Sequence, residues 1–494
     1  MYIALVLSAI TEATAQSLQI GTAAGAIACQ NLTSILGPIK VENNHLALDY
    51  LQTQNTYWNT KQSQYSPACI VYPESSQDVS ISLKAIKAAG SRFSIKAGGH
   101  NPNTYFSSVD QGVLIDLRRM TARSYDSDTT LATYQPGGTF GDIYNYFIQF
   151  NRTVVGARLA GVGTGLALGG GLSYLSGQYG MAADGFRELE VVLPNGQIVT
   201  ASKKENQDLF FACRGGGGNA YGVVTRYTVK SRPVGIFTSG NLFYILDQNK
   251  DVLEALGNFT LYNQDPKAAV IGSYELQSLP TPGLGLDSFI ILFLVYDGPD
   301  PGQVFTNFTR LNPIINTISH KTYIETVNLP TPGTAEASRA ANIFRVAVQR
   351  ISETDLSYVK VFDVFREWCR QNKGSYVISS IDLQPIAKSL TDASEAQGGN
   401  AMRMPPGPWL WFNYLLTTPA GMPDAAYNAI QSSFRDMVNS VPNAQGLPLF
   451  LNDADYDQNP LKTFSSYRRL QLIKEKYDPD QFFANYTGGW SFTN

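Results

Sequence analysis

Residues 94–106 read SIKAGGHNPNTYF, in which a histidine follows two glycines directly after a predicted strand. The whole chain contains three histidines, so His100 is one of few imidazoles available for chemistry. Consecutive glycines after a strand can turn their amide N–H groups towards a diphosphate, and an imidazole beside them is a nucleophile next to the bound group. The alternative is an ordinary loop histidine, which is the commoner role of an isolated histidine in a glycine turn.

The segments before and after this loop predict an α+β unit. CIVYP (69–73) has the pattern of a strand, Ser75 or Ser76 can cap the helix that follows, and Gly90 can end that helix before the strand RFSIKA (92–97). The next predicted elements are strands at 113–117 and 131–136, a helix capped by Thr139, and a hairpin that turns at Asn195 and Gly196. The first domain is therefore predicted at 65–235, after an N-terminal segment at 16–64.

Glycine is unusually dense between Gly156 and Gly185, where ten glycines occur, and again in RGGGGNAYG (214–222). Such density costs backbone entropy, and it is tolerated where the main chain must approach a flat or phosphorylated group closely. A flexible linker is the alternative. Apolar residues interleave these glycines, which disfavours the linker.

The second half of the chain has a different pattern. Long apolar strands are predicted at FIILFLVY (289–296), YVISSIDL (376–383) and PWLWFNYLL (408–416), with amphipathic helices at 355–371 and 425–438. This pattern suits one antiparallel sheet covered by helices on one face, with the other face free to line a pocket. We predict a substrate domain at 236–445 and a C-terminal segment at 446–494, in which LNDADY (451–456) reads as a strand before a charged helix.

Composition excludes some partners. Charged residues make up 16% of the chain and the net charge is −3, so there is no basic excess with which to bind nucleic acid. Residues 1–15 carry a short apolar run and end in Ala-Thr-Ala, which predicts a signal peptide and is too short to span a bilayer, so no membrane partner is expected. The run lacks a basic start, so a wrongly assigned start codon is the alternative.

Two further features of the sequence agree with secretion. Asn-x-Thr glycosylation motifs occur at five positions, namely Asn31, Asn151, Asn258, Asn307 and Asn485. In an oxidising compartment Cys29 is expected to pair with Cys69, whereas Cys213 and Cys369 fit buried free thiols. We therefore expect a secreted or vesicular glycoprotein.

Several chemistries are excluded by the absence of their motifs. The chain has no HExxH, Walker A or GxSxG motif. Gly215-x-Gly217-x-x-Ala220 matches the dinucleotide fingerprint formally, but it follows a predicted helix and not a strand. The histidines are far apart in the sequence and lack clustered carboxylates, so no metal site is predicted.

Three stretches carry a family resemblance. SIKAGGHNP (94–102), DLFFACRGGGGNAYGVVT (208–225) and YRRLQLIKEKYDPDQFFANY (467–486) resemble the PCMH-type FAD-linked oxidoreductases, in particular the fungal branch of the berberine-bridge-enzyme-like family. The resemblance implies an α+β fold, in which an FAD-binding domain of two small sheets with helices joins the substrate domain and the C-terminal segment returns to the FAD domain. It implies that His100 carries FAD covalently. The implied cofactor-binding residues are Ser94, Ile95, Lys96, Ala97, Gly98, Gly99, His100, Asn101, Gly161, Gly165, Gly169, Asp184, Gly222 and Val223.

The same resemblance bears on the chemistry of the flavin. Many family members hold FAD through a second bond to a cysteine in a G-x-C motif, and here Gly156-Ala157-Arg158 matches that motif. With Arg158 in place of the thiol, a single covalent link is expected. Gly161 matches the position that controls oxygen access, and a residue without a side chain there favours reoxidation by O2.

Hydride transfer to a flavin also needs a base, because removal of the heteroatom proton lowers the barrier. The resemblance points to the strand WFNYLL (411–416) and to the pair Asn452-Asp453, so the candidates are Tyr414, Asn413, Asp453 and Tyr105. Tyr414 could equally be one more aromatic in a buried strand, and Asp453 could be a cap. The family's oligosaccharide oxidases have a tyrosine at the position of Asp453.

The resemblance implies an oxidase that acts on a small organic alcohol or amine, such as a fungal secondary metabolite, and forms H2O2 from O2. The expected partners are the substrate and O2, and the expected state is a monomer. Two alternatives remain open from the residues alone. One is a carbohydrate oxidase, and the other is a flavin-binding protein without redox turnover, either a cyclase or an inert glycoprotein.

Overall fold

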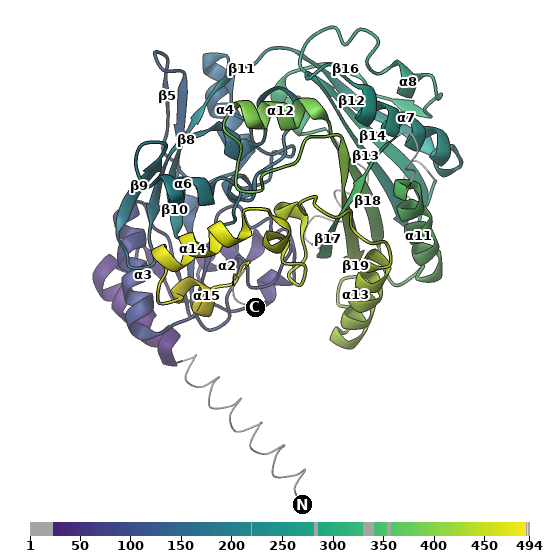
Figure 1. Cartoon of the computed structure of the whole chain (residues 1–494). Coiled ribbons are helices and arrows are strands. Elements are labelled where there is room, and N and C mark those ends of the chain that lie inside the picture. Colours follow the sequence, from purple (N-terminus) through teal and green to yellow (C-terminus); the bar gives the residue numbers. More distant parts are fainter. Residues whose placement is uncertain are drawn as a thin grey trace, which may run out of the picture.

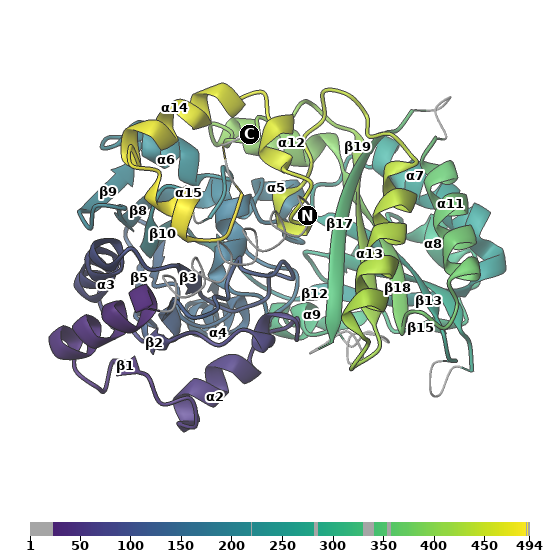
Figure 2. The ribbon, with the colours of Figure 1, turned by 90° about the horizontal axis from the view of Figure 1, so that it is seen from below.

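The computed structural model describes residues 23–218, 220–280, 285–329, 340–352, 357–490 and 492 (Figure 1). The predicted signal peptide lies outside these residues. The three main sheets fall into two groups, with two small sheets in the first half of the chain and one large sheet in the second (Figures 1 and 2). This arrangement confirms the predicted α+β fold.

The first small sheet has the strand order β1-β2-β4-β3. Its strands are β1 (Val41–Glu42), β2 (Cys69–Val71), β3 (Phe93–Lys96) and β4 (Val113–Asp116), and both β2 and β3 run parallel to β4. Helix α3 (Ser76–Ala89) joins β2 to β3. The Ser75 hydroxyl accepts a hydrogen bond from the Asp78 amide, and Gly90 ends the helix in a left-handed conformation, as predicted.

The second small sheet is antiparallel, with the order β5-β6-β10-β8-β9. Its strands are β5 (Arg123–Asp126), β6 (Leu131–Tyr134), β8 (Phe186–Val192), β9 (Ile198–Ser202) and β10 (Val223–Lys230). Helix α4 (Phe140–Phe147) begins after Thr139, which caps it as predicted. The predicted hairpin is β8–β9, and Gly196 adopts a φ of 80° in its turn.

The large sheet has eight strands and is antiparallel throughout. In chain order its strands are β12 (Phe237–Ile245), β13 (Ala268–Gln277), β14 (Ser288–Tyr296), β15 (Ile315–Asn316), β16 (Ser319–Lys321), β17 (Ala341–Arg350), β18 (Ile378–Ile386) and β19 (Trp409–Thr418). Helices α7 (Asn249–Tyr262), α11 (Ser357–Gln371) and α13 (Asp424–Asn439) cover one face of it (Figure 2). Apolar residues of these helices and alternate residues of the strands form one core, so the other face is left to line a site.

The C-terminal segment returns to the first domain, where α14 (Tyr467–Tyr477) and α15 (Phe482–Tyr486) lie beside the small sheets (Figures 1 and 2). Phe482 and Phe483 pack on Phe93 of β3, with ring centroids 5.1 and 5.3 Å away. The prediction of a strand at 451–456 is wrong, because Leu451–Asp453 forms a 3-10 turn. The Asn452 side chain bonds the backbone of the glycine-rich segment instead of standing in a ladder.

The remaining helices and strands are short: α2 (Leu48–Asn55), β7 (Arg152–Thr153), α5 (Ser176–Tyr179), α6 (Gln207–Cys213), β11 (Arg232–Pro233), α8 (Thr306–Thr309), α9 (Tyr323–Val327) and α12 (Lys388–Ala396). Of these, β7 and β11 pair with each other. The dinucleotide-like glycines at 215–217 follow helix α6, as predicted. In the described part of the chain, no helix is long and apolar enough to cross a bilayer.

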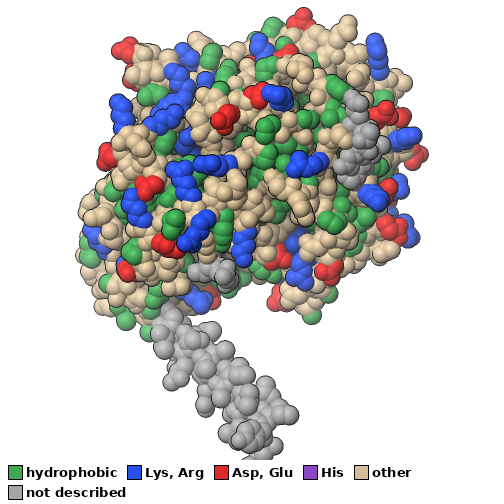
Figure 3. All heavy atoms as spheres, in the orientation of Figure 1, with side chains coloured by type: hydrophobic (Ala, Val, Ile, Leu, Met, Phe, Trp, Pro, Cys, Tyr) green, Lys and Arg blue, Asp and Glu red, His purple; other side chains and the backbone are tan. Residues whose placement is uncertain are grey.

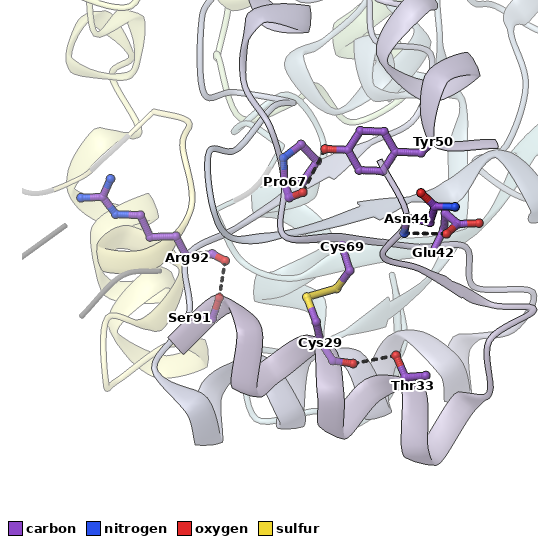
Figure 4. Close-up of a disulfide and its surroundings, with 9 residues drawn as sticks. All are labelled: Cys29, Thr33, Glu42, Asn44, Tyr50, Pro67, Cys69, Ser91 and Arg92. Atoms are coloured by element: carbon purple, nitrogen blue, oxygen red, sulfur yellow. Dashed lines mark hydrogen bonds between the residues drawn. A yellow bond between two sulfur atoms is a disulfide. The ribbon is translucent and has the colours of Figure 1, made fainter. Parts of the chain in front are cut away.

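One disulfide ties the N-terminal helix at 23–36 to the first sheet (Figure 4). It joins Cys29 to Cys69, whose Cα atoms are 5.8 Å apart. Cys213 and Cys369 are free and buried. All three predictions about the cysteines are therefore confirmed.

Candidate active site

A cavity of about 1100 Å³ lies between the first domain and the open face of the large sheet. Ligand pockets commonly measure roughly 300–1,000 Å³, so this cavity can hold a large cofactor together with a small substrate. Glycine-rich loops of the first domain form one side of it, and strands of the large sheet form the other.

The large sheet contributes every second residue of its central strands to the cavity. These residues are Ile271, Ser273 and Glu275 on β13, Ile378, Ser380, Asp382 and Gln384 on β18, and Asn413 and Leu415 on β19. Successive side chains of a strand point to opposite faces, so the residues between them belong to the core under the helices. Ser273, Asp382 and Asn413 stand opposite one another across three adjacent strands and form a polar row.

The structure does not bring Tyr414 into the cavity. It lies between Asn413 and Leu415 on β19, and its side chain therefore points to the opposite face. Its ring is buried 6.1 Å from Phe365 and 6.3 Å from Phe434, both on the covering helices. The alternative considered from the sequence, an aromatic in a buried strand, describes its position.

Tyr105 also lies outside the cavity. It is 43% exposed, and its ring is 4.3 Å from that of Tyr65. Of the four candidates for catalysis, the structure therefore brings together Asn413 and Asp453 and leaves out the two tyrosines.

The glycines of the first domain form a close-fitting cradle. A Cβ atom on Gly163 would lie 2.4 Å from the backbone nitrogen of Gly98, so the two loops touch through bare backbone. Gly99 has a φ of 69°, which favours glycine. Most of the predicted cofactor residues line the cavity here, namely Ile95, Ala97, Gly98, Gly99, His100, Asn101, Gly161, Gly165, Gly169, Gly222 and Val223.

Three predicted cofactor residues lie behind the cradle and do not line the cavity. The buried Lys96 ammonium donates a hydrogen bond to Thr56 and lies 3.6 Å from the Asp116 carboxylate. The Ser94 hydroxyl donates to a backbone carbonyl. The Asp184 carboxylate accepts hydrogen bonds from Asn400 and the Met181 amide, and burial raises its pKa. These contacts hold the loops in place from behind.

His100 lines the cavity from the cradle, with its ring stacked on that of Trp58 at 4.8 Å and 12°. Burial lowers the pKa of His100 to about 4. The imidazole is therefore neutral at pH 7, and one ring nitrogen keeps a lone pair. That is the state a nucleophile needs.

Two carboxyl groups line the cavity on the side of the large sheet. Asp382 accepts a hydrogen bond of 2.5 Å from the Ser273 hydroxyl, and Asp453 accepts one of 2.8 Å from the Gln384 amide. Burial raises the pKa of Asp382 to about 6, and the negative charge of Asp453 adds to that rise. Burial also raises the pKa of Asp453, whereas the Arg158 guanidinium, which lines the same cavity, acts to lower both. A carboxyl group with a pKa near 6 can take up a proton at neutral pH.

Sequence reasoning missed Asp382, Gln384 and Glu275. A signal was present, because Ser380, Asp382 and Gln384 put polar residues at every second position of an otherwise apolar strand. Such alternation inside a covered sheet marks a face that borders a polar site. Among the described residues no group of His, Cys, Asp or Glu is placed to hold a metal ion.

The residues present fit a flavin dinucleotide. The cradle lines the cavity with backbone that carries no side chain, at Gly98, Gly99, Gly161, Gly163 and Gly165, and such backbone lets a diphosphate approach the main-chain amides closely. Residues 67–202 match the family model of an FAD binding domain, and residues 451–488 match the model described as berberine and berberine like. Fold and site together define an FAD-binding oxidoreductase.

Comparisons with individual proteins agree with this assignment. The chain is 32% identical over 469 residues to an uncharacterized FAD-linked oxidoreductase of Arthroderma benhamiae, covering 90% of each chain. It is 30% identical to the bifunctional solanapyrone synthase of Alternaria solani, covering 86% of this chain and 81% of the other. The chain belongs to the FAD-linked oxidoreductases of the berberine-bridge-enzyme-like family, and FAD is its cofactor.

Solved structures share the fold. The wild-type BBE-like 1 protein of Physcomitrella patens superposes with a TM-score of 0.74 at 20% identity, covering 92% of this chain and 97% of the other. The xylooligosaccharide oxidase of Myceliophthora thermophila, in complex with xylobiose, gives a TM-score of 0.75 at 19% identity, covering 92% and 98%. At this identity the likeness establishes the fold.

Proposed function

We propose that this protein is an oxidase that removes a hydride from a carbon bearing a hydroxyl or amino group of a small organic substrate and passes the electrons to O2, forming H2O2. FAD accepts the hydride when bound. The observation that carries the proposal is the Asp382–Asp453 pair, which lines the same cavity as the glycine cradle. A carboxylate there can take the heteroatom proton while hydride leaves the adjacent carbon.

The other residues have supporting roles in this proposal. His100 holds FAD through a single covalent bond. Its neutral imidazole lies in the cradle, and the sequence resemblance matches Arg158 to the cysteine that forms the second bond in many family members. Arg158 keeps part of the carboxyl pair ionised. Asn413 orients the substrate from the position opposite Asp382. Gly161, at which a Cβ would meet no atom within 4 Å, leaves room for O2.

The covalent link can be tested on the purified holoprotein. After acid precipitation, the yellow colour is expected to stay in the pellet of the unmodified protein and to move to the supernatant for His100→Ala. Mass spectrometry should find one flavin adduct, on the peptide that contains His100. Flavin retained in the His100→Ala pellet would assign the link to another residue.

Oxidase turnover needs a separate test. Peroxide release is measured with alcohols, amines and oligosaccharides in turn, and the rate of flavin reduction is then followed without O2. Asp382→Asn and Asp453→Asn are expected to slow reduction by about 10²-fold or more, the usual contribution of a general base. Release of peroxide with oligosaccharides alone would establish a carbohydrate oxidase, and no release with any substrate would favour a flavin protein without turnover.

We also propose that the protein is secreted as a glycoprotein and acts as a monomer. All five Asn-x-Thr asparagines are exposed, so that a transferase can reach them, and the Cys29–Cys69 disulfide suits an oxidising compartment. Peptide N-glycosidase should lower the mass of protein from the native host, and sizing should give one chain. An unchanged mass or intracellular retention would overturn the secretion proposal.

A further inference from the structure

The charged side chains that line the cavity are predominantly acidic. Among the described residues they are three carboxylates, Glu275, Asp382 and Asp453, and one guanidinium, Arg158. Glu275 and Asp453 are buried, and Asp382 is partly buried. The outer face seen in Figure 3 is different, because basic and acidic side chains are interspersed over it. Bound FAD adds a diphosphate, which is also anionic.

Two amide side chains lie beside these carboxylates, and their oxygens are buried. The Gln384 amide gives its N–H to Asp453, so its oxygen is the free end, and that oxygen is buried without a partner. Gln384 is 2% exposed and lines the cavity. The Asn413 oxygen is likewise buried without a hydrogen-bond partner, on a residue 8% exposed. Because neither oxygen has surface open to the cavity, the groups on this side that a ligand can meet are the carboxylates.

Charge distinguishes among the possible ligands. An anionic ligand would add to the acidic excess, and a neutral polyol would leave it uncompensated in a secluded site. A cation would compensate it and could donate N–H groups to the carboxylates. The rings of Phe293 and Phe344 line the same cavity and offer further favourable contact to a cation.

We propose that the substrate is an amine that binds as a cation, with its ammonium group held by the carboxylates of Asp382 and Asp453. The proposal rests on the proposed oxidase function and narrows its substrate class. The ammonium first gives one proton to the carboxyl pair. Bound FAD would accept a hydride, which carries two electrons, from the adjacent carbon, and the nitrogen lone pair would form the C=N bond of an iminium ion.

The products follow from this step. Water hydrolyses the iminium ion to a carbonyl compound and a freed amine. O2 would take up the hydride equivalent, together with the proton that the carboxyl pair received, and would become H2O2. All atoms and electrons are accounted for without a further reactant.

Binding can be tested apart from turnover with three probes of one shape: benzamidine, which is a cation, benzamide, which is neutral, and benzoate, an anion. None has an oxidisable C–H beside its heteroatom, so the change in the visible flavin spectrum of the holoprotein measures binding alone. Benzamidine is expected to bind at least about tenfold more tightly than benzamide, with benzoate weakest. Cellobiose serves as the polyol probe.

Variants test whether Asp382 and Asp453 cause the preference for benzamidine. Asp382→Asn and Asp453→Asn should each reduce the ratio of the benzamide Kd to the benzamidine Kd, while Glu367→Gln, an exposed carboxylate on α11, should leave it unchanged. If the aspartate variants do not fold, the unmodified protein suffices, because the ratio should fall between about pH 7.5 and 5 as the carboxyl pair is protonated. Equal binding of benzamide, or tighter binding of cellobiose, would overturn the proposal.

The two proposals can fail separately. A protein that is yellow, is bleached by dithionite and recovers its colour in air has a working flavin whichever probe it prefers. If such a protein shows no preference for benzamidine, only the amine proposal is lost. If the protein lacks flavin or does not react with O2, the oxidase proposal is lost.

Discussion

Gly98 and Gly163 meet backbone to backbone, and a Cβ atom on Gly163 would lie 2.4 Å from the nitrogen and 2.7 Å from the Cα of Gly98. Neither atom can move without shifting a whole loop, because both belong to the main chain. The contact therefore fixes the distance between the two loops that form the cradle.

Gly163→Ala is expected to separate these loops, which should cost about 1–3 kcal/mol of stability, as overpacking usually does. The FAD content, measured as flavin absorbance per protein, should fall with it. Gly185→Ala is the matched control, because a Cβ there would meet no atom within 4 Å. A Gly163→Ala protein with full flavin content and an unchanged melting temperature would contradict the role of this contact.

Asp382 should set the acid side of the activity profile. Its pKa is raised by burial to about 6, and only the ionised form accepts a proton. The rate of flavin reduction should therefore fall up to about tenfold per pH unit below about pH 6 and level off above it. Stopped-flow measurements between about pH 4.5 and 8 would test this, and a rate independent of pH would remove Asp382 and its partner from the proton transfer.

The raised pKa of Asp382 also makes stability depend on pH, but stability should fall as the pH rises, whereas the rate of flavin reduction should increase. The pKa of Asp382 is about 6 in the folded protein against 3.8 ordinarily, so protonation favours the folded state. Its contribution is fully present below about pH 4 and is lost as the pH rises through about 6. As the pH rises through this range, the Asp382→Asn variant should therefore lose less stability than the unmodified protein. Denaturant unfolding curves at each pH would show the difference.

Arg158 should keep the acid limb of the pH–activity profile at lower pH than it would have without this charge. Its positive charge lowers the pKa of both Asp382 and Asp453. Arg158→Met is expected to move the acid limb upward by about one pH unit, the lower end of the effect of one nearby opposite charge. Arg158→Lys keeps the charge and should keep the limb in place. Equal profiles for the two variants would mean that the charge does not act on the pair.

The buried Arg345 holds the C-terminal segment against β17, since its guanidinium lies 2.9 Å from the Asp455 carboxylate and 2.8 Å from that of Asp457. Arg345→Met leaves Asp455 buried without its cation, which should cost about 3–5 kcal/mol in denaturant unfolding. Adding Asp455→Asn should recover part of the loss, because the uncompensated charge is removed. A double variant no more stable than the single one would show that packing, and not charge, is responsible.

Local signals in the residue order were sufficient for most of the fold. The capping residues Ser75 and Thr139, the helix-ending Gly90 and the turn at Gly196 act on their own neighbours, so they could be read directly. The prediction at 451–456 was wrong because Asn452 finds its partners in Leu166 and Gly171, which are distant in the chain. A bond of that kind has no local pattern.

The cradle and the acid site differ in the same way. The glycines around His100 are close in the sequence, so the motif could be recognised there, and the family resemblance of the three stretches implied FAD. The carboxyl pair could not be found like that, because Asp382 comes from the large sheet and Asp453 from the C-terminal turn. Strand alternation limits β19 to two faces, but the covering helices decide which face is core, and this placed Asn413 in the cavity and Tyr414 outside it.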